Sequence, residues 1–244
     1  MTRLVLQPAF VLHRRPYRNT SLLLEVLSRD AGRLGLVARG ARRLRSPWRG
    51  LLEPFRPLLL SWSGRGEVPT LTAAEEAALL PALPPPRLYS GLYVNELLLR
   101  LLGRHAPHPE LFAAYRGVVE ALAESAEEPA LRLFEKRLLA ELGYGLLLHV
   151  EARTGRPIAA AAAYRYVLEQ GPVAAAQSRI GLPISGRSLL AFGRDDLTDP
   201  TVLREVKRLT RMAIAAHLQG RPLHTRKLLA AGIIRSKALR NEAI

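Results

Sequence analysis

The chain has 244 residues and a formal net charge of +15, from 36 basic and 21 acidic side chains. It has no cysteine, which excludes disulfides and thiolate zinc sites. No secretory signal opens the chain, and no apolar run has the length of a membrane span. The excess of positive charge therefore favours a polyanionic partner, nucleic acid before an anionic membrane surface.

The first 75 residues alternate between apolar and polar side chains, as short strands do. The polar residues 14–19 are predicted as the turn between the first two strands, and a longer basic connection follows the third. This pattern fits a small closed barrel of the OB type, with an SH3-like barrel as the competing choice. The predicted strands are residues 9–13, 21–28, 33–39, 55–62 and 68–74.

A proline-rich segment at residues 81–86 follows the last predicted strand. Its three consecutive prolines interrupt helix and sheet alike and form a stiff spacer. After it, the apolar period changes from two residues to that of a helix. We predict an α+β protein of two domains, with an OB-fold barrel over residues 1–80, a linker at 81–86 and a mainly α-helical domain over 87–244.

Apolar stripes at helical spacing place the helices of the second domain. The last of them has Asp199 as its N-cap and Pro200 in its first turn. Residues 146–182 lack a clear period and are predicted as an irregular insert, with a short hairpin around residues 164–172. The predicted helices are residues 87–103, 109–124, about 129–142, 185–192 and 199–218.

Arginine is concentrated in the predicted barrel. Between residues 10 and 50 there are ten arginines against only Glu25 and Asp30. A solvated surface normally mixes charge signs, so this excess favours phosphate binding; two aromatic side chains among the arginines either stack on bases or join the core. The candidate DNA-binding residues are Arg14, Arg15, Tyr17, Arg18, Arg33, Arg39, Arg42, Arg43, Arg45, Trp48 and Arg49.

A second group of basic residues lies in the last predicted helix. Arg204, Arg208 and Arg211 are spaced i, i+4, i+7 and share one helix face, with Lys207 beside them. This face is either ordinary solvated surface or a second anion-binding surface, for nucleic acid or for an acidic peptide.

Signals of catalysis are weak. The six histidines are scattered, and no pair combines helical ligand spacing with a carboxylate. The segment Gly64-Arg65-Gly66 lacks the lysine and the following helix of a phosphate-binding loop. We therefore expect a protein that is not an enzyme and has no metal and no cofactor.

Several motifs occur together and in order along most of the chain, and with them the sequence resembles the RecO family of bacterial recombination mediators. They include AFVLH at residues 9–13, RPY at 15–17, VARGAR at 37–42, LYSGLYVNEL at 88–97 and LGYG at 142–145. Further matches lie at residues 32–33, 54–58, 64–67, 131–135 and 138–139. The resemblance is greatest to the proteobacterial branch.

The resemblance implies an N-terminal OB fold joined to a helical domain, in a cytoplasmic, nucleoid-associated protein. It also implies binding of single- and double-stranded DNA, annealing of complementary strands, and help in loading RecA onto gaps covered by single-strand-binding protein. The implied partners are RecR and the acidic C-terminal tail of single-strand-binding protein, with no membrane. Many members carry a four-cysteine zinc site in the middle of the helical domain, which this chain cannot form.

A tail of the kind implied by the resemblance is acidic and ends in an apolar residue with a free carboxylate. It needs an apolar pocket surrounded by cations. We predict that the helices at residues 130–142 and 199–218 pack side by side and that their exposed edges form such a groove. The candidate peptide-binding residues are Arg132, Lys136, Arg137, Arg204, Lys207, Arg208 and Arg211.

The sequence is thus interpreted as a non-enzymatic DNA-repair mediator. The alternative is a basic RNA- or ribosome-associated protein that uses the same OB surface and prefers structured RNA through its ribose hydroxyls. A nucleolytic or transferase enzyme ranks third, because no cluster of metal ligands supports it.

Overall fold

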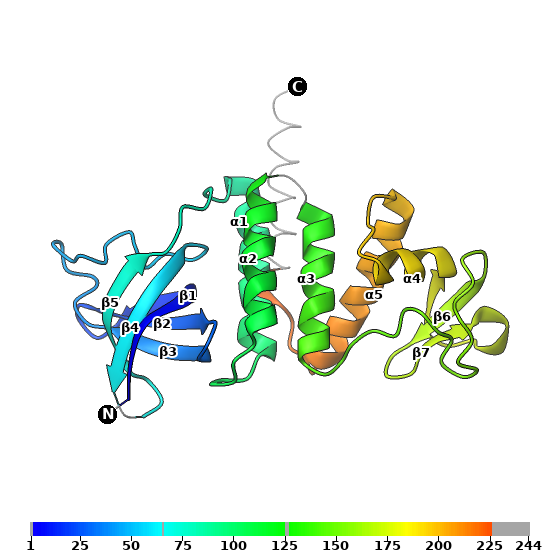
Figure 1. The fold of residues 1–244 in the computed structure, drawn as a ribbon, viewed down its shortest axis with the longest axis horizontal. Coiled ribbons are helices and arrows are strands. Elements are labelled where there is room, and N and C mark those ends of the chain that lie inside the picture. The colour runs from blue at the N-terminus through cyan, green and yellow to red at the C-terminus, as the bar shows by residue number, and fades with distance from the viewer. Residues whose placement is uncertain (1, 65, 125–126, 226–244) are drawn as a thin grey trace, which may run out of the picture. The chain divides into compact units, whose positions relative to one another are not determined.

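The computed structural model describes residues 2–64, 66–124 and 127–225, and its N-terminal part is a closed barrel of five strands (Figure 1). Around the barrel the order is β1-β2-β3-β5-β4, and every pair is antiparallel except β3 and β5. This order and the parallel closure are those of an OB fold, so the OB prediction is confirmed over the SH3-like alternative. The strands are β1 (Thr2–Tyr17), β2 (Ser21–Ser28), β3 (Gly32–Ala38), β4 (Pro57–Gly64) and β5 (Thr70–Glu76).

Strand β1 is much longer than predicted. The turn predicted at residues 14–19 is shorter and lies at residues 18–20, because Arg14 to Tyr17 continue the strand and pair with Leu24 to Ser21 of β2. Residues 2–10 of the same strand pair with β4, so β1 closes the barrel by joining two neighbours. Residues 13–16 are all exposed, and this run of exposed side chains removes the alternation by which a strand is recognised.

The barrel core is formed by inward-facing aliphatic side chains from all five strands. Alternation along each strand places one face inside, as the pattern of Leu34, Leu36 and Ala38 predicts. Trp62 of β4 belongs to this core, and Trp48, from the connection between β3 and β4, packs against it. The chain has two tryptophans, so tryptophan fluorescence reports on the barrel alone.

Two helices, α1 (Pro85–Leu101) and α2 (Pro109–Glu124), pack in the same compact unit as the barrel. Helix α1 begins two residues earlier than predicted, so the predicted linker overlaps its first turn. Proline is tolerated there because the first amides of a helix have no partner within it. By their internal contacts the described residues divide into two compact units between α2 and α3, and residues 223–225 belong to the barrel unit.

A buried polar contact joins the barrel to these helices. The Asn95 side chain, 2% exposed, donates from Nδ2 to the carbonyl oxygen of Leu12 over 2.8 Å. The Tyr115 hydroxyl donates to Asn95 Oδ1 over 2.7 Å, and burial raises the pKa of Tyr115 so that it stays a donor. Phe10 lies with its ring centroid 4.9 Å from that of Tyr115 and 5.4 Å from that of Phe112.

The second unit contains three helices and a small antiparallel sheet. Its helices are α3 (Glu127–Glu141), α4 (Gly186–Gly193) and α5 (Pro200–His217), close to the predicted bounds. Asp199 caps α5 as predicted, because its Oδ1 accepts from the amide of Thr201 over 2.7 Å. None of the helices that the structure describes is long and apolar enough to cross a membrane.

The predicted insert at residues 146–182 is more regular than expected. It holds the hairpin of β6 (Ala163–Val167) and β7 (Gly171–Ala174), and β8 (Leu182–Ser185) pairs with β6 on its other side. Tyrosine hydroxyls accept from the backbone amides of Leu147 and Ala159, and burial raises the pKa of one of them, Tyr166, to about 12. Hydrogen bonds of this kind hold together the insert in a chain without cysteine.

Replacing Asn95 with Ala tests whether the barrel and the helices unfold together. The variant leaves the Leu12 carbonyl and the Tyr115 hydroxyl buried without partners, so we expect a loss of about 3 kcal/mol in the free energy of unfolding. Tyr115→Phe removes one bond and should cost about 1 kcal/mol. Urea unfolding is followed by tryptophan fluorescence. A barrel transition that neither substitution moves would mean that the barrel is stable without the helices.

Candidate nucleic-acid interface

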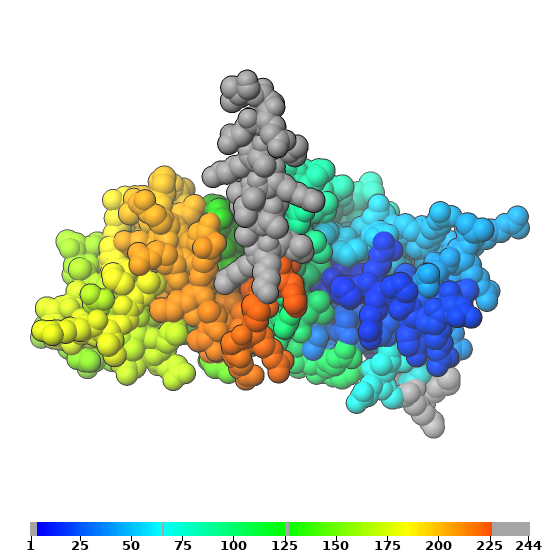
Figure 2. Space-filling model, turned by 180° about the vertical axis from the view of Figure 1, so that it is seen from behind, coloured from blue at the N-terminus to red at the C-terminus, as the bar shows by residue number. Residues whose placement is uncertain are grey.

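The connection between β3 and β4, residues 39–56, carries most of the candidate arginines and protrudes from the barrel (Figure 2, light blue). It is a series of tight turns, in which the amides of Arg43, Ser46 and Arg49 each donate to the carbonyl three residues before. Ala41 and Leu52, 6% and 0% exposed, anchor its two ends in the barrel core. The arginines between them therefore face solvent.

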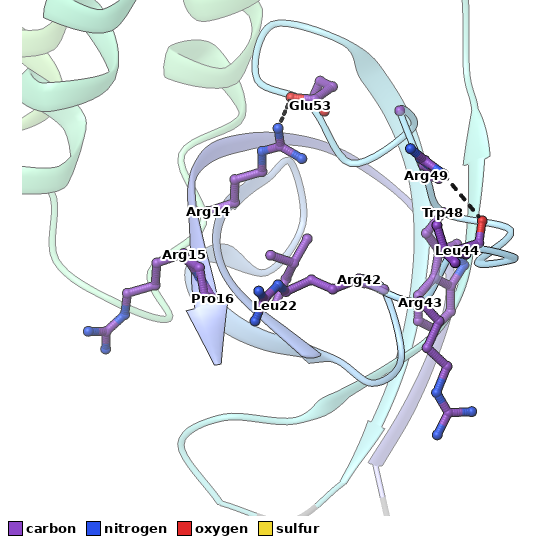
Figure 3. A pocket seen from close by; sticks show the side chains of 12 residues that line it. Arg14, Arg15, Pro16, Leu22, Arg42, Arg43, Leu44, Trp48, Arg49 and Glu53 are labelled. Atoms are coloured by element: carbon purple, nitrogen blue, oxygen red, sulfur yellow. Dashed lines mark hydrogen bonds and ion pairs between the residues drawn. The ribbon is translucent and has the colours of Figure 1, made fainter. Parts of the chain in front are cut away.

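One hollow, which we call the Trp48 hollow, lies between this connection and the end of β1 and has a volume of about 660 Å³ (Figure 3). Arg42 extends toward Leu22, whereas the guanidinium groups of Arg15 and Arg43 point outward. Arg14 Nη2 lies 2.7 Å from the Glu53 carboxylate. The residues that line it are Arg14, Arg15, Pro16, Leu22, Ala41, Arg42, Arg43, Leu44, Trp48, Arg49, Gly50 and Glu53.

A second hollow of about 590 Å³, the Tyr17 hollow, lies on the outer face of β2 and β3. It is bounded by the β1–β2 turn and the β4–β5 connection, which are the places where OB folds bind oligonucleotides. The Arg18 guanidinium carbon lies 5.2 Å from the centroid of the Tyr17 ring. The residues that line it are Tyr17, Arg18, Thr20, Ser21, Leu23, Val37, Arg39, Gly40, Arg43, Val68 and Thr70.

Most of the positive charge around the two hollows is uncompensated. Of the arginines that line them, only Arg14 forms an ion pair within the described residues. Arg42 and Arg49 donate instead to backbone carbonyls, which leaves their charge in place. Arg45 is also exposed but lines neither hollow. Such a concentration of unpaired guanidinium groups attracts phosphate.

Comparison with known proteins agrees with the fold. The family models for the N-terminal and C-terminal parts of recombination protein O match residues 1–79 and 85–227. DNA repair protein RecO of Alkalilimnicola ehrlichii is 52% identical over 93% of this chain and 91% of its own length. RecO of Nitrosococcus oceani is 50% identical, over 93% of both chains.

The chain belongs to the RecO family. A third relative, the DNA repair protein RecO of Haemophilus influenzae strain Rd, is 46% identical over 94% of this chain and 97% of its own length. The resemblance to the proteobacterial RecO proteins is thus confirmed over nearly the whole sequence. The members of this family named here are DNA repair proteins.

One of the predicted DNA-binding residues, Arg33, lines neither hollow. Arg33 is half-buried beside α1, where its Nη1 donates to the Leu99 carbonyl over 3.2 Å and lies 3.5 Å from the Glu25 carboxylate. Burial lowers the pKa of Arg33, although Glu25 acts in the opposite direction. Its place in the sequence among exposed arginines is misleading. Alternation along β3 puts Arg33 on the same outer face as Val37, but at Arg33 helix α1 covers that face.

Apart from Tyr17, the uncharged residues that line the Tyr17 hollow were not among the predicted site residues. Leu23 and Val37, which are opposite each other on β2 and β3, line the Tyr17 hollow together with Thr70. The strand pattern contained the signal, because side chains that alternate with the core residues must lie on the outer face of the barrel.

In the second unit, α3 and α5 pack together as predicted, but Arg132 is not at an exposed edge. It is 3% exposed, its Nη2 lies 2.8 Å from Glu135, and its Nη1 donates to Thr210 over 3.3 Å. Lys136 and Lys207 are also paired, with Asp195 and Glu128 respectively. The remaining predicted residues are exposed, namely Arg137, Arg204, Arg208 and Arg211.

The pairing of Arg132 predicts that this residue stabilises the second unit. Arg132→Ala leaves the Glu135 carboxylate buried without its counter-ion and should cost about 3–5 kcal/mol in the free energy of unfolding. Arg208→Ala, on the exposed face of α5, should change it by about 0.5 kcal/mol or less. Calorimetric unfolding measures both. In a double variant, Arg132→Met with Glu135→Leu should recover most of the loss; equal stability of the two single variants would contradict the buried position.

Proposed function

We propose that this RecO family member is a recombination mediator that binds single- and double-stranded DNA and anneals complementary strands. In this role it helps load RecA onto gaps covered by single-strand-binding protein. The observation that carries the proposal is the set of unpaired arginines around two hollows on an OB barrel. The named activity of its relatives, DNA repair, supports it.

Annealing requires that two strands of like charge approach each other. Arginines that contact phosphates release the condensed counter-ions and replace them with fixed positive charge, which lowers the repulsion between the strands. Because phosphate contacts carry no sequence information, the protein can act on any sequence. The role is one of binding and positioning, and the proposal assigns no catalytic step to any residue.

The proposed protein partners are RecR and the acidic tail of single-strand-binding protein, and the proposed location is the cytoplasm, at the nucleoid. For the tail, the exposed arginines of α5 supply the positive part of a binding surface. Arg204, Arg208 and Arg211 lie on the side of α5 opposite to Val206 and Leu209, which are buried. A guanidinium on this surface can grip a carboxylate with two hydrogen bonds.

Removing four of the exposed arginines of the β3–β4 connection tests the proposed DNA surface. Replacing Arg39, Arg42, Arg43 and Arg45 with Ala should weaken binding to all sequences equally and flatten the slope of log K against log salt by about 0.7–0.9 per lost contact. The double variant Arg29→Ala with Arg116→Ala is the control, because both arginines are exposed in the same unit but are paired with Asp30 and Glu120.

Fluorescence anisotropy with single-stranded DNA and with a matched RNA measures both the binding affinity and its dependence on salt. Unchanged affinity and slope in a folded quadruple variant would remove this surface from the mechanism. Tighter binding to structured RNA than to DNA would replace DNA repair with the RNA-associated alternative.

Charge reversal on α5 tests the proposed peptide surface. Arg204→Glu with Arg208→Glu should abolish binding of an acidic tail peptide and leave annealing of naked DNA nearly unchanged, because these residues lie in the other unit. Arg156→Glu with Arg179→Glu reverses two exposed charges of the same unit that do not belong to α5 and is the control. Isothermal titration calorimetry measures the affinity for the peptide. Wild-type peptide affinity in the α5 variant would place the surface elsewhere, and equal loss of peptide binding and annealing would make α5 part of the DNA surface.

A further inference from the structure

We propose that the two hollows hold different strands, a single strand in the Tyr17 hollow and its complement in the Trp48 hollow, with Arg43 shared between them. This inference rests on the proposed annealing function and assigns the strands to sites on the barrel. It starts from the observation that the two sets of lining residues have one member in common, Arg43.

A fixed piece of backbone lies between the hollows. Thr20 lines one hollow and Arg42 lines the other, and the Arg42 amide donates to the Thr20 carbonyl over 2.8 Å. The Arg42 guanidinium also donates to the carbonyls of Arg18 and Asn19, over 3.5 and 3.4 Å. The β1–β2 turn is therefore tied to the β3–β4 connection, and the two hollows stay separate while both are open to solvent.

The hollows differ in what they offer a strand. The Tyr17 hollow is lined by an aromatic ring and the apolar side chains of Leu23 and Val37, together with three arginines. This combination suits unpaired bases, which stack on aromatic rings while cations follow the phosphates. It is the better site for the first, single strand.

The Trp48 hollow is lined by more charge than the Tyr17 hollow. Five arginines line it against one carboxylate, Glu53. Trp48 is half-buried because it packs on the barrel core, so less of its ring is available for stacking than an exposed ring would offer. A site dominated by cations holds a strand by its phosphates and leaves the base edges free to pair.

Arg43 is placed to act on both strands. It follows the left-handed Gly40, at φ 71°, and its amide donates to the Gly40 carbonyl over 3.0 Å. Its guanidinium points outward and forms no ion pair within the described residues (Figure 3). A single guanidinium has five donors and can contact phosphates of two strands, so Arg43 reduces the repulsion at the point where they must meet.

The test asks whether one protein chain binds two DNA strands at once when the strands cannot pair with each other. Two oligothymidines of about 16 nucleotides, the upper site size of one OB fold, carry a donor and an acceptor dye. We expect energy transfer on the wild-type protein and, by native mass spectrometry, two strands per chain. Tyr17→Ala with Arg39→Ala, or Arg15→Ala with Arg49→Ala, should each leave one strand per chain and slow annealing by about 10-fold or more.

The Arg43→Ala variant should keep both strands but lose most of the annealing rate. Arg29→Ala with Arg116→Ala, which removes two paired charges outside the hollows, is the control and should match the wild type. One strand per chain in the wild type, with both double variants weakening that same binding, would overturn the inference in favour of one continuous track and leave the proposed DNA binding intact. Absence of DNA binding in the wild type would overturn the proposed function itself.

Discussion

The arginines at one end of the barrel repel one another, and the fold has to hold them together against this repulsion. Guanidinium groups crowd around the end of a small barrel, and in water the chain would spread them apart. They stay close together because the connection that carries them is held at both ends by buried residues, Ala41 and Leu52, and by Trp48 packed on the core. Apolar burial thus holds the charges together at an electrostatic cost. A bound polyanion removes that cost.

The barrel in turn depends on how β1 closes it and on what lies beside it. One strand pairs with β2 along its second half and with β4 along its first, so the site at the end of β1 is fixed by the whole sheet. Asn95 and Tyr115 then join β1 to α1 and α2 by buried hydrogen bonds. A rigid support of this kind holds the arginine backbone at fixed positions, which a mobile basic tail could not do.

Much of this arrangement follows from the sequence. Alternation predicts strands β2 to β5, and apolar stripes with Asp199 as a cap predict the helices, because each pattern reflects one local rule. Both ends of β1, residues 2–8 and 14–17, and the strand β8 were missed, since exposed residues 13–16 and the short Leu182–Ser185 segment do not alternate detectably. Their strand structure comes from pairing with distant residues.

The same limit applies to individual side chains. Sequence spacing grouped Arg33 with the exposed arginines and Arg132 with the edge of a groove, yet both face neighbouring helices within their own units. An arginine is exposed or buried according to which carboxylate and carbonyl partners the fold brings to it, here Glu25 and Glu135. These partners cannot be predicted from the local sequence, whereas the excess of positive charge can be counted from it.

The central claim is that DNA lies on the arginine-lined end of the barrel. Photo-crosslinking with single-stranded DNA that carries 5-iodouracil tests it most directly, because the reagent couples to aromatic side chains in contact with the base. The account predicts adducts on Tyr17, with none on the buried Trp62. Adducts confined to the second unit, such as on the exposed Tyr144, would contradict it.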